Sequence, residues 1–229
     1  PLHGSSAASD VYKRQVASYP LLSRLYQKNE IDELSKLVKK QLSYLFLIGG
    51  SLMVGAIVNA DYLIKIIYER GAFTSTDTAR VSGVFVIISL AIIPWSINQI
   101  LTRSYYVQQK FWFPVVTGSF ITLLTSIILF NAASNSQTYA WIIIFSLYIY
   151  CIVLLVSIKF NSEKIFNKNL VVEFSKIILI LVLVYFVFGI AVSLSGILNL
   201  VFSILLIPVV IFVSLSLLNF EYINIAKRR

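Results

Sequence analysis

The chain has 229 residues, of which 58% are hydrophobic and 13% are charged, whereas about 25% of the residues in a soluble domain are charged. So few charges cannot cover a globule in water, which excludes a soluble globular protein and predicts one that is solvated by lipid. The net charge of +9 would suit a nucleic-acid partner, but the charges are distributed as in a membrane protein, and we expect no nucleic-acid partner.

The first fifteen residues, PLHGSSAASDVYKRQ, differ from the rest of the chain. They are small and polar, show no periodicity, and lack the apolar core of a signal peptide. We expect residues 1–15 to be an assembly or cloning scar, with a disordered native N-terminus as the alternative. If they are a scar, the chain is a fragment, and VASYPLLSRLY is the cytoplasmic end of a helix whose beginning is missing.

The segment NEIDELSKLVKK, residues 29–40, has the pattern of an amphipathic helix. Its acids precede its bases, an order that complements the helix dipole, and Ile31, Leu34 and Val38 share one face. Asn29 is the predicted N-cap. We expect a short helix on the inner membrane surface that then turns into the first span. A partner-binding helix is the functional alternative.

Six apolar runs of about 20 residues follow, the helix length that a bilayer core of about 30 Å requires. Transmembrane strands would be shorter and would alternate in polarity, which these runs do not. The predicted fold class is an all-α integral membrane protein with six full transmembrane helices plus the end of a seventh, a helical lobe over residues 16–229. The spans are expected at about 42–60, 81–102, 111–130, 139–158, 177–194 and 197–218.

The stretch DYLIKIIYER, residues 61–70, is predicted to form an interfacial helix at the outer surface. Asp61, Lys65 and Glu69 follow one another at intervals of four residues. This spacing predicts a stack of alternating charges on one face of the helix.

The residues after this helix predict a stop and a new start. Gly71 is placed to end the helix in the left-handed conformation. Thr74 is the predicted N-cap of the next helix, with Asp77 reaching back to it as in a capping box. The polar stretch therefore fixes where the chain re-enters the membrane.

Two of the predicted spans contain a proline, Pro94 in the second and Pro208 in the last. Each proline removes one backbone hydrogen bond and kinks its helix. Bent helices are common in transporters that alternate between two openings, although proline is also frequent in membrane helices of other kinds.

Polar residues gather at the end of the second span, in SINQILTRSYY. Asn98, Gln99 and Arg103 are the candidate substrate-binding residues, because a cation that faces a cavity could hold a phosphate through the planar guanidinium fork. The alternative is that Arg103 extends to the cytoplasmic headgroups as an anchor.

Groups that would support catalysis or metal binding are scarce in the sequence. No Asp or Glu lies well inside a span, Cys151 is the single cysteine, and His3 is the single histidine. We therefore expect no catalytic residue, no metal site and no cofactor, and predict that the protein is not an enzyme.

The loops alternate in basic charge. If Lys13 and Arg14 are left out, the odd-numbered loops, counted with the C-terminus, hold 14 lysines and arginines and the even-numbered loops hold 3. Basic loops face the cytoplasm. We therefore expect residues 23–40 and the C-terminus to be cytoplasmic, and the loop around Gly71 to face outward.

Two motifs in this chain resemble the lipid II flippases (MurJ, also called MviN) of the multidrug/oligosaccharidyl-lipid/polysaccharide exporter superfamily. IIYERGAFTSTDTA resembles the family's "RGAF…DT" loop, and QILTRSYYVQQKFWFP resembles its "vLaRafYarqdtrtP" pattern. YPLLSRLY also resembles the end of the family's eighth helix. Beyond residue 130, only the number and spacing of helices support the resemblance. The motif residues are Gly71, Phe73, Thr74 and Asp77 in the loop, and Leu101, Arg103, Tyr106, Gln109 and Pro114 after it.

The resemblance implies that the chain is the C-terminal lobe of a fourteen-helix, two-lobe flippase. Such proteins move lipid II, an undecaprenyl-pyrophosphate-linked peptidoglycan precursor, across the bacterial inner (cytoplasmic) membrane by alternating access. The implied partners are this lipid-linked oligosaccharide, membrane lipids and the N-terminal lobe, which carries most of the cavity arginines. The helices predicted over residues 177–218 would form a groove for the lipid tail.

The chain also departs from the family pattern. Lys110 stands where the family has an acidic residue, and Phe111 to Phe113 replace its usual threonines. These departures leave the substrate open. A flippase for another lipid-linked oligosaccharide, such as O-antigen or exopolysaccharide, is one alternative, and a membrane enzyme that acts on polyprenyl phosphates is another.

Overall fold

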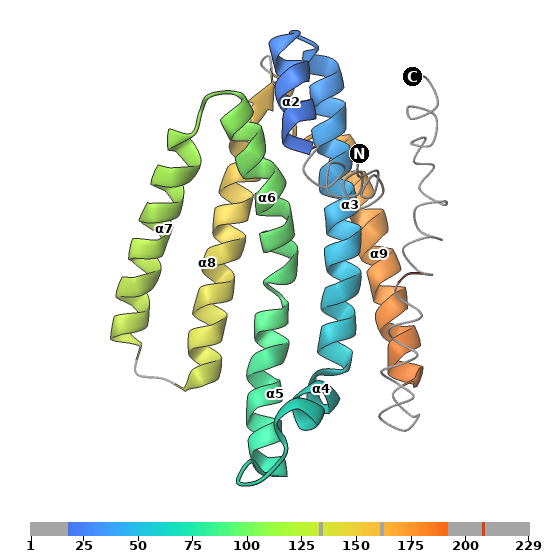
Figure 1. Ribbon diagram of the computed structural model, residues 1–229, viewed down its shortest axis with the longest axis vertical. Coiled ribbons are helices and arrows are strands. Elements are labelled where there is room, and N and C mark those ends of the chain that lie inside the picture. The colour runs from blue at the N-terminus through green and yellow to red at the C-terminus, as the bar shows by residue number, and fades with distance from the viewer. Residues whose placement is uncertain (1–17, 133–134, 161–162, 192–207, 209–229) are drawn as a thin grey trace, which may run out of the picture.

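The computed structural model of the chain describes residues 18–132, 135–160 and 163–191, together with Pro208. Its long helices lie side by side in the order α7, α8, α5 with α6, α3 and α9 (Figure 1). A short hairpin of two antiparallel strands joins α8 to α9. The elements are α2 (Ser18–Gln27), α3 (Ile31–Val58), α4 (Ala60–Tyr68), α5 (Ser75–Ser89), α6 (Ile92–Val107), α7 (Trp112–Asn131), α8 (Ser136–Ser157), β1 (Lys159–Phe160), β2 (Glu163–Lys164) and α9 (Lys168–Ala191).

Five helical stretches in the described part of the chain are long and apolar enough to cross a membrane. They overlap the first five predicted spans, and the first and the fifth begin earlier than predicted. The sixth predicted span, 197–218, lies outside the described residues except for Pro208. The helical stretches are Ile31–Val58, Ser75–Val107, Trp112–Asn131, Ser136–Ser157 and Lys168–Phe186.

The predicted surface helix is wrong as a separate element, because α3 runs without a break from Ile31 to Val58. No glycine or proline interrupts the chain between Ile31 and Gly49, so nothing ends a helix between the amphipathic segment and the span. The side chains of Leu34, Val38 and Leu42 are fully buried at helical spacing. The apolar face of the amphipathic segment thus continues directly into that of the span and packs against α2 and α6.

The predicted N-cap role of Asn29 is also wrong. Glu30 occupies that position, and Asn29 has a φ of 57°. Its N–H donates to the carbonyl of Tyr26 at 3.0 Å, and the N–H of Glu30 donates to that of Leu25 at 3.0 Å. These two bonds form a Schellman motif, in which asparagine is among the residues that best tolerate the left-handed conformation. Asn29 therefore ends α2 and does not begin α3.

The polar stretch after α4 was predicted in most respects. The backbone N–H of Thr74 donates to Asp77 Oδ2 at 2.9 Å, as the capping box requires. Gly71 has the predicted positive φ, 63°, but it lies in a turn two residues beyond the C-cap, Glu69. The predicted charge stack is not formed, because Glu69 lies past the end of α4 and accepts a hydrogen bond of 2.7 Å from Thr78 Oγ1.

The second span is interrupted at the place that Pro94 predicts. Helix α5 ends at Ser89 and α6 begins at Ile92. Because Pro94 has no N–H, the carbonyl of Leu90, four residues earlier, loses its helical partner. The hydroxyl of Tyr148 on α8 donates to this carbonyl at 3.0 Å. The residues around Pro208, where a second kink is predicted, lie outside the described part.

Two consecutive glycines allow α3 to approach two helices closely. A Cβ atom on Gly49 would lie 3.2 Å from Ser96 Oγ of α6, and one on Gly50 would overlap the side chain of Leu181 on α9. Near Gly50, Phe46 of α3 stacks on Phe174 of α9 with ring centroids 4.5 Å apart. Close backbone approach at small residues is the usual way in which helices associate in lipid.

Candidate functional site

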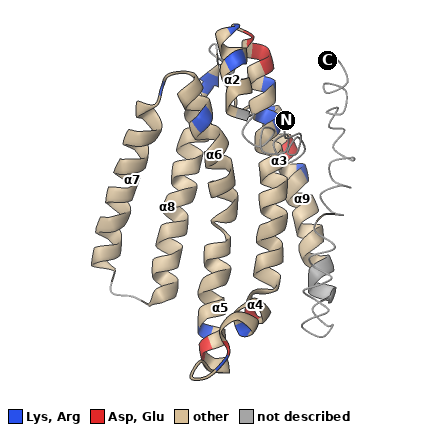
Figure 2. Cartoon of the chain, viewed as in Figure 1, with Lys and Arg blue, Asp and Glu red and all other residues tan. Residues whose placement is uncertain are grey.

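The described charges are divided unequally between the two ends of the helical layer (Figure 2). We call the end with α2, the start of α3 and the hairpin the basic end. It carries eleven lysines and arginines and five acids, and the opposite end carries three of each among the described residues. This is the asymmetry that the loop charges predicted. That the basic end faces the cytoplasm remains a prediction.

The three predicted substrate-binding residues all lie on α6, in its second half. Gln99 is exposed and Arg103 is partly exposed, and they share one face at a spacing of four residues. Asn98 lies on a neighbouring face, and its Oδ1 is buried without a hydrogen-bond partner. None of the three lines either of the two cavities described next.

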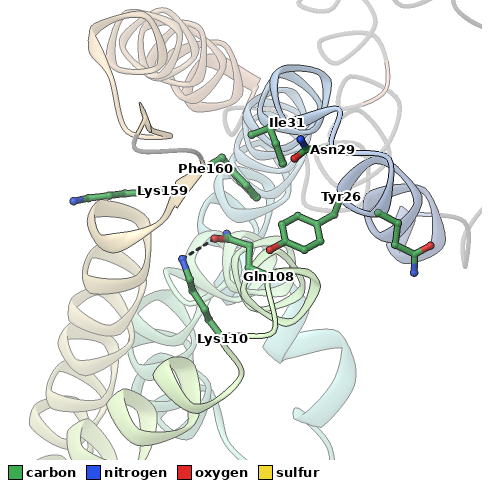
Figure 3. Close-up of a pocket in the computed structure, with 8 residues that line it drawn as sticks. Tyr26, Asn29, Ile31, Gln108, Lys110, Lys159 and Phe160 are labelled. Carbon is green, nitrogen blue, oxygen red and sulfur yellow. Dashed lines mark hydrogen bonds between the residues drawn. The ribbon is translucent and has the colours of Figure 1, made fainter.

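A cavity of about 640 Å³ lies at the basic end, between the ends of α2 and α6 and strand β1. In Figure 3, the hydroxyl of Tyr26 points toward Gln108, and Lys110 points toward Gln108 from another side. Lys110 Nζ donates to Gln108 Oε1 at 3.0 Å. The lining residues are Tyr26, Gln27, Asn29, Ile31, Gln108, Lys110, Lys159 and Phe160.

A second cavity, of about 340 Å³, adjoins the first. The two share Gln108, Lys110 and Lys159, and the second adds the aromatic side chains of Tyr105, Trp112 and Phe113. The rings of Tyr105 and Phe113 are stacked with centroids 5.1 Å apart. The paired cavities, which we call the two-lysine pocket, thus combine cations and amides with an aromatic wall.

The C-terminal ends of two helices, α2 and α6, form the edge of this pocket with the same type of turn. At the end of α6, Gln109 has a φ of 59°. Its N–H donates to Tyr106, and the N–H of Lys110 donates to Tyr105 at 3.0 Å, which is again a Schellman motif. Gln109 and Asn29 are the non-glycine residues with positive φ in the described ranges. Each of them turns the chain at the edge of the first cavity.

Strand β1 supplies the remaining cation. Phe160 is 3% exposed and belongs to the main core. Because side chains alternate along a strand, the neighbouring Lys159 is directed outward and is exposed. Residues 159 and 164, both lysines, are paired across the hairpin. Lys36 forms an ion pair with Glu33, and no ion pair with a carboxylate is formed by Lys110 or Lys159 within the described residues.

The two-lysine pocket was not predicted from the sequence. Lys110 and Lys159 were counted among the loop charges that indicate topology, and Asn29 was predicted to begin a helix. The only local signal was the unusual Lys110 beside aromatic residues. Nothing in the sequence indicates that residues 26, 108 and 159 meet, because only the packing of α2, α6 and α8 brings them together.

Comparison with known proteins identifies the family. Residues 15–212 match the family described as lipid II flippase MurJ. The chain belongs to the MurJ family. This confirms the family resemblance inferred from the two motifs.

A solved MurJ structure has the same fold. The structure, titled "Lipid II flippase MurJ, inward closed conformation", aligns with a TM-score of 0.69 and 22% sequence identity, and covers 89% of this chain and 42% of its own chain. The likeness confirms the predicted all-α membrane fold. The chain thus spans less than half the length of that MurJ. No curated protein gives a significant match.

Proposed function

We propose that this chain acts in moving lipid II across the bacterial inner membrane, as one helical lobe of a two-lobe flippase that works by alternating access. The observation that carries the proposal is the match of residues 15–212 to the MurJ family. The fold likeness over 89% of the chain supports it. The partner that completes the transport path is, in this proposal, an N-terminal lobe of the same protein.

Arg103 is the residue of this lobe that we assign to the substrate. It is partly exposed and lies on the same face of α6 as the exposed Gln99. The pyrophosphate of lipid II is doubly anionic. A planar guanidinium group suits such an anion, because it can donate two parallel hydrogen bonds to it. Asn98 lies beside this face, and its Oδ1 is a buried acceptor without a hydrogen-bond partner, so a substrate donor could reach it only if the helices around α6 move apart.

The interruption between α5 and α6 supports a transport role. A span that is divided into two helical segments can change its angle at the division without breaking regular hydrogen bonds. Here the carbonyl of Leu90, which Pro94 leaves without a helical partner, accepts a hydrogen bond from a side chain on α8. The two segments are therefore joined by a bend that a side-chain contact from α8 supports.

The test is transport of lipid II by the purified full-length protein in proteoliposomes. A fluorescent lipid II is placed in the inner leaflet, and its appearance in the outer leaflet is measured with a membrane-impermeant quencher. The expected result is protein-dependent appearance of lipid II. If the protein does not move lipid II but does move a lipid-linked O-antigen unit, its substrate is the second class and not lipid II.

Transport of the lipid-linked O-antigen unit is measured in parallel, because Lys110 and Phe111 to Phe113 depart from the family pattern. Complementation of a strain depleted of its own flippase provides an independent readout. If the protein is present in the membrane at normal levels, moves neither substrate and rescues no growth, the flippase proposal is wrong.

A further inference from the structure

We propose that the two-lysine pocket binds a phosphate-bearing head group at the basic end of the helical layer. This proposal does not depend on the substrate proposed above. It concerns a site formed by α2, α6 and β1, and it uses none of the residues assigned to lipid II.

The charge of the pocket favours an anion. Lys110 and Lys159 both line the two adjoining cavities, and no carboxylate among the described residues pairs with either lysine. Glu30, which lies between α2 and α3 next to the lining residue Asn29, is exposed, and Glu163 lies on β2, paired across the hairpin with Phe160. Two cations at the edge of a cavity raise the local concentration of anions and favour their binding.

The polar groups in the pocket suit phosphate oxygens in particular. Lys110 is held by Gln108 Oε1 at 3.0 Å, which positions its ammonium at the wall between the cavities. Tyr26 adds a hydroxyl directed toward Gln108 (Figure 3). Lys159 points away from the other labelled residues in Figure 3. Because it is exposed on a flexible four-carbon stem, it can swing toward a bound anion.

The position of the pocket suits a lipid head group. It lies where the spans that include α6, α7 and α8 end, which is the depth of the phosphates in a bilayer. The second cavity is walled by Tyr105, Trp112 and Phe113, and Trp112 is 68% exposed. Aromatic rings of this kind lie at head-group level in membrane proteins. Basic pockets between membrane helices are known to bind anionic head groups.

Two sources of the phosphate are compatible with this chemistry, an anionic phospholipid and a free phosphate ion. The experiment measures binding to the purified full-length protein by native mass spectrometry and by thermal stability. Its probes are phosphatidylglycerol, the zwitterionic phosphatidylcholine, and inorganic phosphate without lipid. The variant is Lys110→Gln with Lys159→Gln. The matched control is Lys65→Gln with Arg80→Gln, which also removes two exposed cations, but at the opposite end.

We expect the Lys110/Lys159 variant to bind phosphatidylglycerol more weakly, by about fivefold for each lysine removed. The control variant should bind like the unaltered protein. Replacement of both lysines by arginine should retain binding. Gln108→Glu should weaken it without removing a lysine, because the new carboxylate would pair with Lys110. Because glutamate has nearly the same size as glutamine, a loss of binding in this variant would not be explained by misfolding.

The three probes separate the sources. Lysine-dependent binding of phosphatidylglycerol, with no effect of inorganic phosphate, supports a lipid head group. Lysine-dependent stabilisation by inorganic phosphate alone supports a free anion in the same pocket. Equal binding of phosphatidylglycerol by the unaltered protein and the Lys110/Lys159 variant overturns the proposal, and so does equal binding of phosphatidylglycerol and phosphatidylcholine.

Discussion

The hydroxyl of Tyr148 donates a hydrogen bond of 3.0 Å to the carbonyl oxygen of Leu90, the acceptor that Pro94 leaves without a helical partner. In a bilayer core no water is available to take this role, and an unsatisfied carbonyl there is costly. The contact joins α8 to the bend between α5 and α6. It explains how a divided span can be stable within lipid.

Tyr148→Phe should lower the free energy of unfolding by about 1–2 kcal/mol, because it leaves the Leu90 carbonyl unsatisfied. The measurement is a thermal or denaturant melt of the protein in detergent. Tyr139→Phe is the matched control, since it removes an exposed hydroxyl that donates to Ala132 at 2.9 Å. It should change stability by less than about 0.5 kcal/mol.

A double-mutant cycle tests the cause of that loss. Pro94→Ala restores an N–H that can bond to the Leu90 carbonyl, so Tyr148→Phe should cost little in that background. If the two substitutions are simply additive, the tyrosine does not act through the carbonyl freed by the proline.

Gly50→Ala should destabilise the contact between α3 and α9, because its Cβ would overlap Leu181. We expect a net loss of about 1–3 kcal/mol from overpacking, although alanine is the better helix former. Gly118→Ala is the control, since its Cβ would lie 3.4 Å from Tyr150, an ordinary contact distance. Leu181→Ala should restore stability to Gly50→Ala, and no recovery would show that the clash lies elsewhere.

Gly71→Val should reduce thermal stability by about 1–2 kcal/mol, because a residue with a Cβ resists the left-handed conformation. No atom lies within 4 Å of a Cβ built at Gly71, where φ is 63°, so the loss is one of backbone strain alone. Gly71→Asn should cost clearly less, since asparagine tolerates this region. Equal stability of all three proteins would contradict the assigned turn.

Arg103→Ala should reduce transport of lipid II by about tenfold or more if its guanidinium holds the pyrophosphate. Arg103→Lys separates the two interpretations of this residue. If Arg103 is an anchor in the head groups, the lysine variant should transport lipid II equally well. If Arg103 forms a bidentate contact with the phosphate, the lysine variant should transport less. Arg80→Ala at the opposite end is the control. Membrane levels of each variant must be measured alongside transport.

The spans and the capping box could be predicted because their signals are local. A run of 20 apolar residues specifies a membrane helix by itself, and Thr74 and Asp77 lie three residues apart. The break near Pro94 was equally readable, because the proline acts on a carbonyl four residues away. The contact of that carbonyl with Tyr148 was not, since 58 residues separate the partners.

The failures have physical causes of two kinds. Charges in residues 29–40 suggested a separate surface helix. No residue there breaks a helix, however, and the burial of Leu34 and Val38 stabilises a helix that continues into the span. The two-lysine pocket was beyond any local pattern, because it depends on where α2, α6 and α8 end relative to one another. Lys110 and Lys159 look alike in sequence whether they face a cavity or open water.

The adjacent glycines of α3 make that helix sensitive to its own length. Gly49 faces α6 and Gly50 faces α9 at the same depth, and each residue advances an α-helix by about 100°. A deletion or insertion of one residue between Leu42 and Gly49 would therefore rotate the buried face of Leu34, Val38 and Leu42 by that angle relative to both close contacts. Substitutions along α3 are thus compatible with the fold, whereas insertions and deletions would misalign α3 with both α6 and α9.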